Sequence, residues 1–412
     1  MRKFTAIVCL LVAIIANAQY TNPGFYRVHN ANTDAYISIK GTHYQFTSKP
    51  NAFWSCILML KDSAQVSDPG SIIYIPRMEQ TSLYAQGVST YSLTEMWMDV
   101  DTAKVREGGL DTYIATTVMM INDRPFKCYF RDEGVGLTAG SSDKTDARWW
   151  IEPVSEESIE TSFLGVKPQS EVVVDADGWY WTTTCCDFPM LLPQDGGVEG
   201  AYTVKNINAG DDGKYYAAVE KVYGQGEIVP AATPVLLKCK YSYASGNKVV
   251  PTGDIANNTT FPLVSDLLQG GYFSTFNNYY DVNSYDMTTY YPDQAIKASA
   301  TNLALGVDAE GVLGFFPQEE GTYMAANSAW LSIEGMEELD GVDAIYLAMP
   351  VMMGDANGDG VLNIADLTAL VDYLLNGETK NEINLAAFDI NSDGVINVMD
   401  LSMLIDLLLD WR

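Results

Sequence analysis

Two twelve-residue segments near the end of the chain repeat one pattern of oxygen-bearing residues, 34 residues apart. Residues 355–366 read DANGDGVLNIAD, and residues 389–400 read DINSDGVINVMD. Each segment has Asp or Asn at positions 1, 3, 5, 9 and 12 and glycine at position 6. Oxygen ligands at this spacing, with a glycine for the sharp turn, can surround a hard cation. An acidic turn without a ligand has no reason to repeat every position, so the pattern predicts two cation-binding loops.

Calcium is the expected cation, because it takes six to eight oxygen ligands from loops with this spacing, known from EF-hands. Position 7 supplies only a main-chain carbonyl, so valine fits there. Two ions are expected. The predicted ligands are Asp355, Asn357, Asp359, Val361, Asn363 and Asp366 in the first loop, and Asp389, Asn391, Asp393, Val395, Asn397 and Asp400 in the second.

A helical spacing of apolar residues follows each loop, and the two stripes correspond one for one. They consist of Ile364, Leu367, Leu370, Val371 and Leu374, and of Val398, Leu401, Leu404, Ile405 and Leu408. The two helices are expected to pack on each other. Residues 354–412 hold 11 acidic and 2 basic residues. Since uncompensated ligand carboxylates repel one another, this segment is expected to be largely unfolded without calcium.

Duplicated loop-helix units with Asp rather than Glu at position 12 resemble a type I dockerin over residues 351–412. This resemblance implies a module that docks onto a cohesin-type domain on a scaffold or cell surface. In that family, loop positions 10 and 11 help to recognise the cohesin and are often hydroxylic. Here the corresponding predicted partner-binding residues are apolar: Ile364, Ala365, Val398 and Met399. A calcium-stabilised end module without a cohesin partner is the alternative.

The first eighteen residues have the composition of an export signal: Arg2 and Lys3, an apolar run, and Ala16-Asn17-Ala18 as a cleavage site. The run is shorter than the roughly 20 residues that span a bilayer, and no later segment is apolar enough to span. The mature protein is therefore expected to be secreted, extracellular or associated with a cell surface. Export leaves five cysteines, an odd number that cannot form a complete disulfide framework.

The charge balance excludes other classes of function. With 24 basic and 53 acidic residues, the chain has a formal charge of −29, which repels nucleic acid. Its 2 His are too few for a histidine-rich zinc site.

The body predicts β structure, with short runs of Tyr, Val, Ile and Thr between turn residues and a helical period only within Leu93 to Thr117. A weak threefold echo, at residues 37–41, 83–87 and 137–140, suggests a β-trefoil-like domain over residues 19–155. Residues 156–350 are expected to hold a linker, Ser155 to Ser170, and a β-sandwich-like domain, whose motifs over 171–348 resemble a β-rich module common in exported bacterial surface proteins. The predicted fold is thus mostly β with a small all-α calcium-binding domain at residues 351–412.

Two aromatic groups are candidate glycan-binding residues. Trp179 and Trp181 alternate along a strand and so face one side of it; a core position is favoured, and a platform that stacks on a sugar ring is the alternative. The segment Phe276–Pro292 reads as a surface loop, because polar turn formers separate its aromatic pairs. Its tyrosines fit stacking on sugars. They are Tyr279, Tyr280, Tyr290 and Tyr291.

These features together predict a secreted, non-catalytic protein that displays glycan- or ligand-binding β domains through a docking module, in the context of polysaccharide use. The alternative is a dockerin-bearing glycoside hydrolase, which needs only two facing carboxylates. No sequence motif marks such a pair. A purely structural surface protein is a third class and predicts that no ligand is found.

Overall fold

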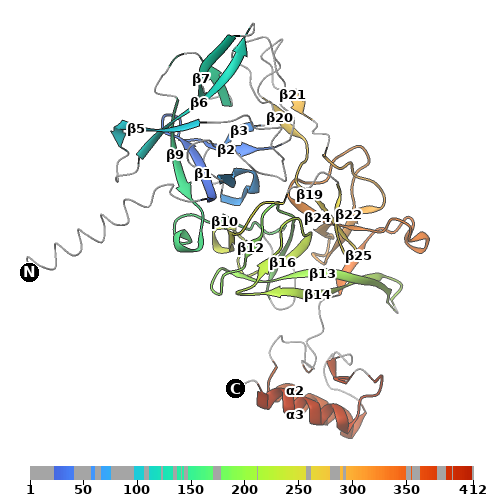
Figure 1. Ribbon diagram of the computed structural model, residues 1–412. Coiled ribbons are helices and arrows are strands. Elements are labelled where there is room, and N and C mark those ends of the chain that lie inside the picture. Colours follow the sequence, from blue (N-terminus) through green and yellow to red (C-terminus); the bar gives the residue numbers. More distant parts are fainter. Residues whose placement is uncertain are drawn as a thin grey trace, which may run out of the picture.

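The computed structural model describes most of the β body and much of the C-terminal helical segment (Figure 1). The described residues are 23–40, 57–60, 66–75, 97–105, 111–121, 124–132, 137–140, 142, 147–169, 178–210, 212–256, 261–278, 288–290, 294–348, 354, 362–377, 387–391 and 393–410.

The first β unit is one sheet of nine strands. Seven of them lie in the order β3-β2-β1-β9-β6-β7-β8, while β4 pairs with β1 and β5 pairs with β6. Its strands are β1 (Gly24–Asn30), β2 (Tyr36–Ile39), β3 (Ile57–Leu60), β4 (Ile73–Ile75), β5 (Trp97–Val105), β6 (Asp111–Ile121), β7 (Arg124–Asp132), β8 (Leu137–Gly140) and β9 (Arg148–Pro153). The helical period considered within Leu93 to Thr117 is wrong. The described residues of that range lie in β5 and β6, because β-branched residues such as Thr116 and Thr117 favour an extended backbone.

The first and last strands of this unit lie side by side. β1 pairs with β9 from Tyr26 opposite Pro153 to Asn30 opposite Trp149. Trp149 is fully buried, and its indole nitrogen donates to the Phe130 carbonyl at 3.2 Å. The mostly β prediction is therefore confirmed. The trefoil-like detail stays a prediction, because part of the threefold echo, at residues 83–87, lies outside the described residues.

The second β unit contains a sheet of ten strands, in the order β11-β16-β13-β14-β25-β23-β22-β24-β19-β18, and a smaller sheet in the order β10-β17-β12-β15. β20 and β21 form a separate pair. The strands are β10 (Leu164–Gly165), β11 (Tyr180–Thr184), β12 (Met190–Leu191), β13 (Val198–Ala209), β14 (Tyr215–Gly224), β15 (Ile228–Val229), β16 (Val235–Cys239), β17 (Lys248–Pro251), β18 (Leu263–Ser265), β19 (Leu268–Gly271), β20 (Phe276–Asn278), β21 (Thr288–Tyr290), β22 (Asn302–Val307), β23 (Leu313–Pro317), β24 (Ser328–Ser332) and β25 (Ile345–Ala348).

Strand β16 is buried on both faces, which explains its continuous apolar sequence. Val235, Leu237 and Cys239 belong to one core, whereas Leu236 belongs to another. The core around Leu236 also contains Trp181 of β11 and Leu331 of β24. These strands come from distant positions in the sheet order, so the large sheet curves around this core.

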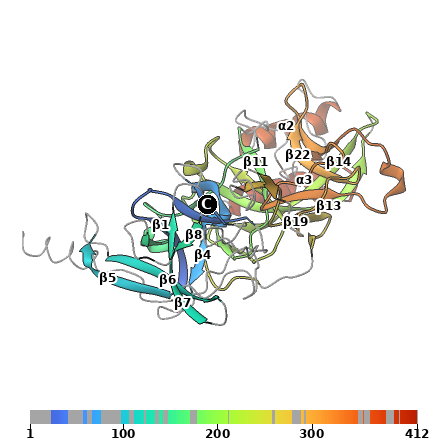
Figure 2. The ribbon, with the colours of Figure 1, turned by 90° about the horizontal axis from the view of Figure 1, so that it is seen from above.

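The other core joins the two β units. It combines Phe25, Ile72 and Val154 of the first unit with residues such as Phe188 of the second, and the Phe25 and Phe188 ring centroids lie 5.5 Å apart. The two units lie side by side in both ribbon views (Figures 1 and 2). The β units are therefore held together by packed apolar side chains.

The segment predicted as a linker is packed and not free. β10 pairs with β17, with Leu164 opposite Val249. Leu164 and Val166 are both buried in the core shared by the two β units. Short 3-10 helices complete the described elements: η2 (Pro69–Ser71), η4 (Glu156–Ser158), η5 (Ala244–Gly246) and η6 (Glu337–Leu339).

Two helices form the C-terminal segment: α2 (Ile364–Asn376) and α3 (Val398–Asp410). Both were predicted, and they pack through a core centred on Leu370, Phe388 and Leu404. Not every residue of the two apolar stripes is buried: Ile364, Val398 and Ile405 are 74%, 68% and 40% exposed. Ile364 and Val398 are the first residues of their helices. No helix in the described part of the chain is long and apolar enough to cross a membrane.

Candidate metal centre

The second predicted calcium loop, residues 389–400, has its ligand side chains arranged by main-chain N–H groups of the same loop. The Asp389 carboxylate accepts from the Asp393 N–H at 3.0 Å and from the Gly394 N–H at 2.8 Å. Gly394 has φ of 81°, a left-handed conformation that favours glycine. This explains the glycine at position 6, because the tight turn brings the loop back towards its first ligand.

Further oxygens along the loop are held in the same way. The Asn391 side-chain oxygen accepts from the Asp393 N–H at 2.9 Å, and the Asp393 carboxylate accepts from the Val395 N–H at 2.9 Å. The Asn397 amide donates to the Val395 carbonyl at 2.9 Å. The predicted ligands at positions 3, 5, 7 and 9 are therefore already linked to one another by short local contacts.

Asp400 at position 12 closes the loop onto helix α3. It is fully buried, and its Oδ1 accepts from the Ile390 and Asn391 N–H groups at 2.9 and 3.4 Å. Its Oδ2 accepts from the Asn397 N–H at 2.8 Å. One carboxylate thus connects the start of the loop to the start of the helix.

The end of the first loop repeats this geometry. Asp366 is also fully buried, and its Oδ2 accepts from the Asn363 N–H at 2.8 Å. Asn363 caps α2 by accepting from the Ala365 N–H at 2.7 Å, which equals the distance from the Met399 N–H to Asn397 in the second loop. The remaining predicted ligands of the first loop, Asp355, Asn357, Asp359 and Val361, lie outside the described residues.

The loop entrances are joined across the repeat. The Gly354 N–H donates to the Ala387 carbonyl at 2.8 Å. Gly354 has φ of 94°, and a side chain there would meet Leu404 and Leu362 at 2.7 and 2.8 Å. The residue before the first loop is therefore glycine because it packs against the core of the two helices.

The chemistry of this donor set fits calcium. Among the described residues, no group of three Asp, Glu, His or Cys side chains is placed to hold a metal ion by itself, so the amide oxygens and the Val395 carbonyl are needed as well. A mixture of carboxylate, amide and main-chain oxygens is what calcium takes and what zinc or copper does not prefer. The residues that would hold the ion in the second loop are Asp389, Asn391, Asp393, Val395, Asn397 and Asp400.

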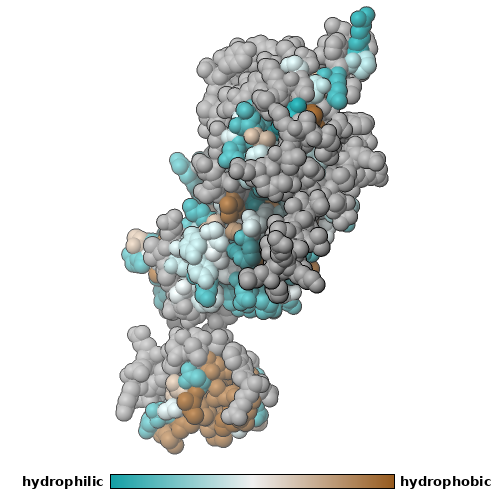
Figure 3. Space-filling view, turned by 90° about the vertical axis from the view of Figure 1, so that its left-hand side faces the viewer, coloured by the Kyte–Doolittle hydropathy of each residue, from teal (hydrophilic) through white to brown (hydrophobic). Residues whose placement is uncertain are grey.

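The predicted partner-binding residues are exposed. Ile364, Val398 and Met399 have 74%, 68% and 61% of their surface exposed, and Ala365 is exposed as well. Apolar surface gathers on the described part of this segment (Figure 3). Exposed apolar clusters of this kind typically mark a protein interface.

The predicted glycan-binding residues differ in how deeply the structure buries them. Trp181 is fully buried against Tyr202, with ring centroids 5.0 Å apart, so the favoured core position is correct and stacking on a sugar is excluded for this residue. Trp179 is half-buried, with the Lys238 ammonium 5.3 Å from its ring centroid. Tyr279, Tyr280 and Tyr291 lie outside the described residues.

The segment Phe276–Pro292 is not a loop throughout. Its two ends form β20 and β21, which pair with Phe276 opposite Tyr290. The surface-loop interpretation is wrong at these ends, because extended aromatic and threonine residues pair across the segment.

An aromatic cluster that the sequence did not reveal lies on a half-buried face of the large sheet. Tyr216 of β14 and Tyr346 of β25 pair in register, with ring centroids 6.1 Å apart, and Phe316 of β23 lies 6.4 Å from Tyr346. All three are half-buried. Only the pairing of three strands that are distant in sequence brings them together. Alternation within each strand was the available signal, and it could not show which strands are neighbours.

The comparison with protein families agrees with the geometry of the two loops and helices. Residues 353–409 match the family model of the dockerin type I domain. A search of curated proteins finds no match to the chain. Dockerin domains as a class bind calcium and dock onto cohesin domains, and this chain carries a type I dockerin domain at residues 353–409.

Proposed function

We propose that the chain is an exported docking protein whose C-terminal module holds two calcium ions and binds a cohesin-type partner, so that the β units are displayed on a scaffold or cell surface. In this proposal the β units do not catalyse a reaction. They present a surface that binds a glycan.

One observation carries the docking part of this proposal. The buried carboxylates Asp366 and Asp400 each connect a predicted calcium loop to the first turn of a helix. The exposed residues Ile364 and Val398 lie in those same first turns. Calcium binding and presentation of the apolar surface therefore depend on the same few residues, and we expect docking to require the metal.

The glycan part of the proposal is supported by the cluster of Tyr216, Phe316 and Tyr346. Half-buried rings on a sheet face offer flat apolar surfaces for sugar rings. Asp212 accepts from the Tyr216 hydroxyl at 2.7 Å, and the Lys214 ammonium lies 4.6 Å from the Tyr346 ring centroid. Polar groups that could bind sugar hydroxyls thus surround the rings.

The docking proposal is tested by capture of the full chain on a panel of immobilised cohesin domains, in calcium and in chelator. Capture by at least one cohesin only in calcium is expected. Ile364→Glu combined with Met399→Glu should weaken capture at least tenfold and leave calcium affinity unchanged, because both side chains are exposed and neither is a predicted ligand. The matched control is Val312→Glu, an exposed apolar residue of the β body that is 46% exposed.

Capture that is equal in calcium and chelator, or equal for the double variant and the control, would contradict this assignment of the docking surface. A glycan array with product analysis tests the other part. Retention of a glycan without product supports display, whereas release of product would favour the glycoside hydrolase alternative.

A further inference from the structure

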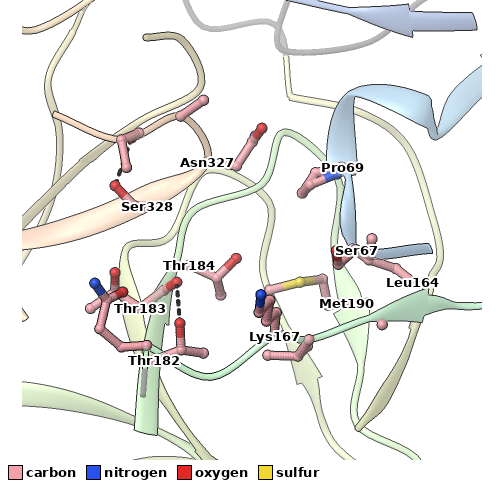
Figure 4. Close-up of a pocket in the computed structure, with 15 residues that line it drawn as sticks. Ser67, Pro69, Leu164, Lys167, Thr182, Thr183, Thr184, Met190, Asn327 and Ser328 are labelled. Carbon is pink, nitrogen blue, oxygen red and sulfur yellow. Dashed lines mark hydrogen bonds between the residues drawn. The ribbon is translucent and has the colours of Figure 1, made fainter. Parts of the chain in front are cut away.

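A cavity of about 200 Å³ lies where the two β units meet. The second unit lines it with Thr182, Thr183 and Thr184 of β11, and with Asn327 and Ser328 at the start of β24 (Figure 4). Other described lining residues come from residues 67–69 of the first unit and from residues 164–169. Cavities that hold drug-sized ligands measure roughly 300–1,000 Å³, so this one is suited to a single small ring.

The charge of the lining is opposite to the charge of the chain. The chain has 53 acidic and 24 basic residues, yet the described lining residues include Lys167 and no Asp or Glu. Asp68 lies between two lining residues in the sequence, but its Oδ1 is 2.7 Å from the Lys40 ammonium and accepts from the Gly70 N–H at 3.0 Å. Solvent-exposed charges more than about 8 Å apart are largely screened at physiological ionic strength. The lining, more than the net charge, therefore decides which ligand charge is favoured, and it favours an anion.

Lys167 is fixed beside β11 by main-chain hydrogen bonds on both sides of it. The Val166 N–H donates to the Asn247 carbonyl at 2.7 Å. The Gln169 N–H donates to the Trp181 carbonyl at 2.9 Å. An ammonium group has three donors, so it can keep a protein partner and still bind a carboxylate. The segment thus holds a charged donor at the cavity.

The remaining polar lining consists of hydroxyl and amide side chains, such as those of Thr183, Asn327 and Ser328. Each of these groups can both donate and accept a hydrogen bond, as sugar hydroxyls do. A small apolar surface that includes Met190 and Ala326 completes the lining. One carboxylate, several hydroxyls and a short apolar face are the groups that a hexuronic acid carries on one ring.

An acidic peptide fits this lining less well. β11 is the terminal strand of its sheet, and its outer edge is already bonded on both sides of Thr183. The Trp181 carbonyl accepts from the Gln169 N–H at 2.9 Å. The Cys185 N–H donates to the Asn327 carbonyl at 3.1 Å. A peptide that adds a strand needs main-chain groups at every second position of the edge, and here the neighbouring positions are occupied.

We propose that this cavity binds a hexuronic acid residue of an acidic glycan, with the Lys167 ammonium paired to the sugar carboxylate. The hydroxyls of Thr183 and Ser328 bond to the ring hydroxyls, and Met190 contacts the apolar face of the ring. This inference rests on the proposed display of glycan-binding β units and adds a site that selects an acidic sugar.

The test is titration of the full mature chain with glucuronate and with glucose, followed by calorimetry and by saturation-transfer NMR. The two sugars differ only in the group at the last carbon, a carboxylate or a hydroxymethyl. Glucuronate should bind about tenfold or more tightly, because hydrogen bonds between charged groups are the stronger ones. Acetate has the same charge without the hydroxyls and should bind about tenfold or more weakly than glucuronate. Equal binding of glucuronate and glucose, or of glucuronate and acetate, would overturn the proposal.

Variants of the lysine assign the binding to this cavity. Lys167→Met removes the ammonium from an exposed side chain and should lower the affinity for glucuronate about tenfold or more. Lys167→Arg keeps the charge and should retain the affinity within about threefold. The matched control is Lys240→Met, which removes the same charge from an exposed position outside the described lining. Unchanged glucuronate binding in Lys167→Met, or an equal loss in Lys240→Met, would overturn the proposal.

The outcome also separates this inference from the proposed function. If the chain retains neutral glycans while glucuronate fails to bind, this site is wrong and the display proposal stands. If no glycan is retained and glucuronate does not bind, both fail, while calcium-dependent capture on cohesin is measured independently. A short aspartate-rich peptide that displaces glucuronate and binds more tightly would refute the assignment of a sugar.

Discussion

Asp400→Ala should loosen both helices of the C-terminal module. Asp400 is fully buried, and its carboxylate accepts from the Ile390 and Asn397 N–H groups at 2.9 and 2.8 Å. Hydrogen bonds to a charged acceptor contribute about 1.5–3 kcal/mol each. The two short bonds together give a loss of about 3–6 kcal/mol in the free energy of local unfolding.

Calcium adds to this loss, because the variant also lacks a predicted ligand. A ligand present at about a thousand times its dissociation constant stabilises the folded state by about 4 kcal/mol. Weaker calcium binding at the second loop removes part of that stabilisation. The difference in stability between the intact module and the variant is therefore expected to be larger in calcium than in chelator, where only the loss of the hydrogen bonds remains.

Hydrogen-deuterium exchange of the full chain, read on peptides that cover α2 and α3, measures this directly. A loss of about 3 kcal/mol corresponds to protection that is about 100-fold lower. The control is Asp406→Ala, which removes the same charge from an exposed position of the same helix and should change protection by less than about threefold. If both variants exchange alike in calcium, Asp400 does not close the loop.

Two other predictions concern the β body. Gly270→Ala should lower the free energy of unfolding by about 1–3 kcal/mol, because the new methyl would lie 2.9 Å from Cys185 and 3.0 Å from Pro234. The control Gly271→Ala has its nearest contact at 3.5 Å and should change the free energy of unfolding by less than about 0.5 kcal/mol. Equal melting temperatures of the two variants would contradict this packing. Burial raises the pKa of the Cys186 thiol to about 12 and the pKa of the Cys185 thiol well above its usual value. Neither thiol should therefore react with iodoacetamide at pH 8 until the chain is denatured. Rapid labelling of the folded chain would show that these thiols are accessible.

The sign of the thiol effect on stability follows from the same burial. The unfolded thiol ionises near pH 9, while the folded Cys186 thiol stays protonated to about pH 12. Its contribution is therefore complete below pH 9 and is lost as the pH rises from 9 towards 12. Thermal unfolding at pH 8 and pH 10 should show a lower melting temperature at the higher pH.

Local signals predicted part of this molecule well. Asn363 and Asn397 are favourable helix caps that sit directly before apolar periodicity, and α2 and α3 begin at the next residue in each case. The adjacent Cys185 and Cys186 belong to two different cores, as neighbouring side chains of an extended chain point to opposite sides. Each of these features depends on a few neighbouring residues, which a sequence displays directly.

Other features depend on partners that are remote in the chain. Trp179 and Trp181 both lie near the Lys238 ammonium, but only the core shared with β24 decides that Trp181 is buried. The position of β11 at the end of its sheet likewise depends on pairing between strands that are distant in sequence. No local pattern marks a strand as the edge of a sheet.

Calcium calorimetry on the full chain tests whether two calcium loops build the docking module. We expect two ions to bind per chain, and Asp355→Ala combined with Asp389→Ala to abolish both binding events and the protection of α2 and α3. A chain that binds no calcium, or a double variant that binds it as tightly as the unaltered protein, would show that these loops are not the metal sites.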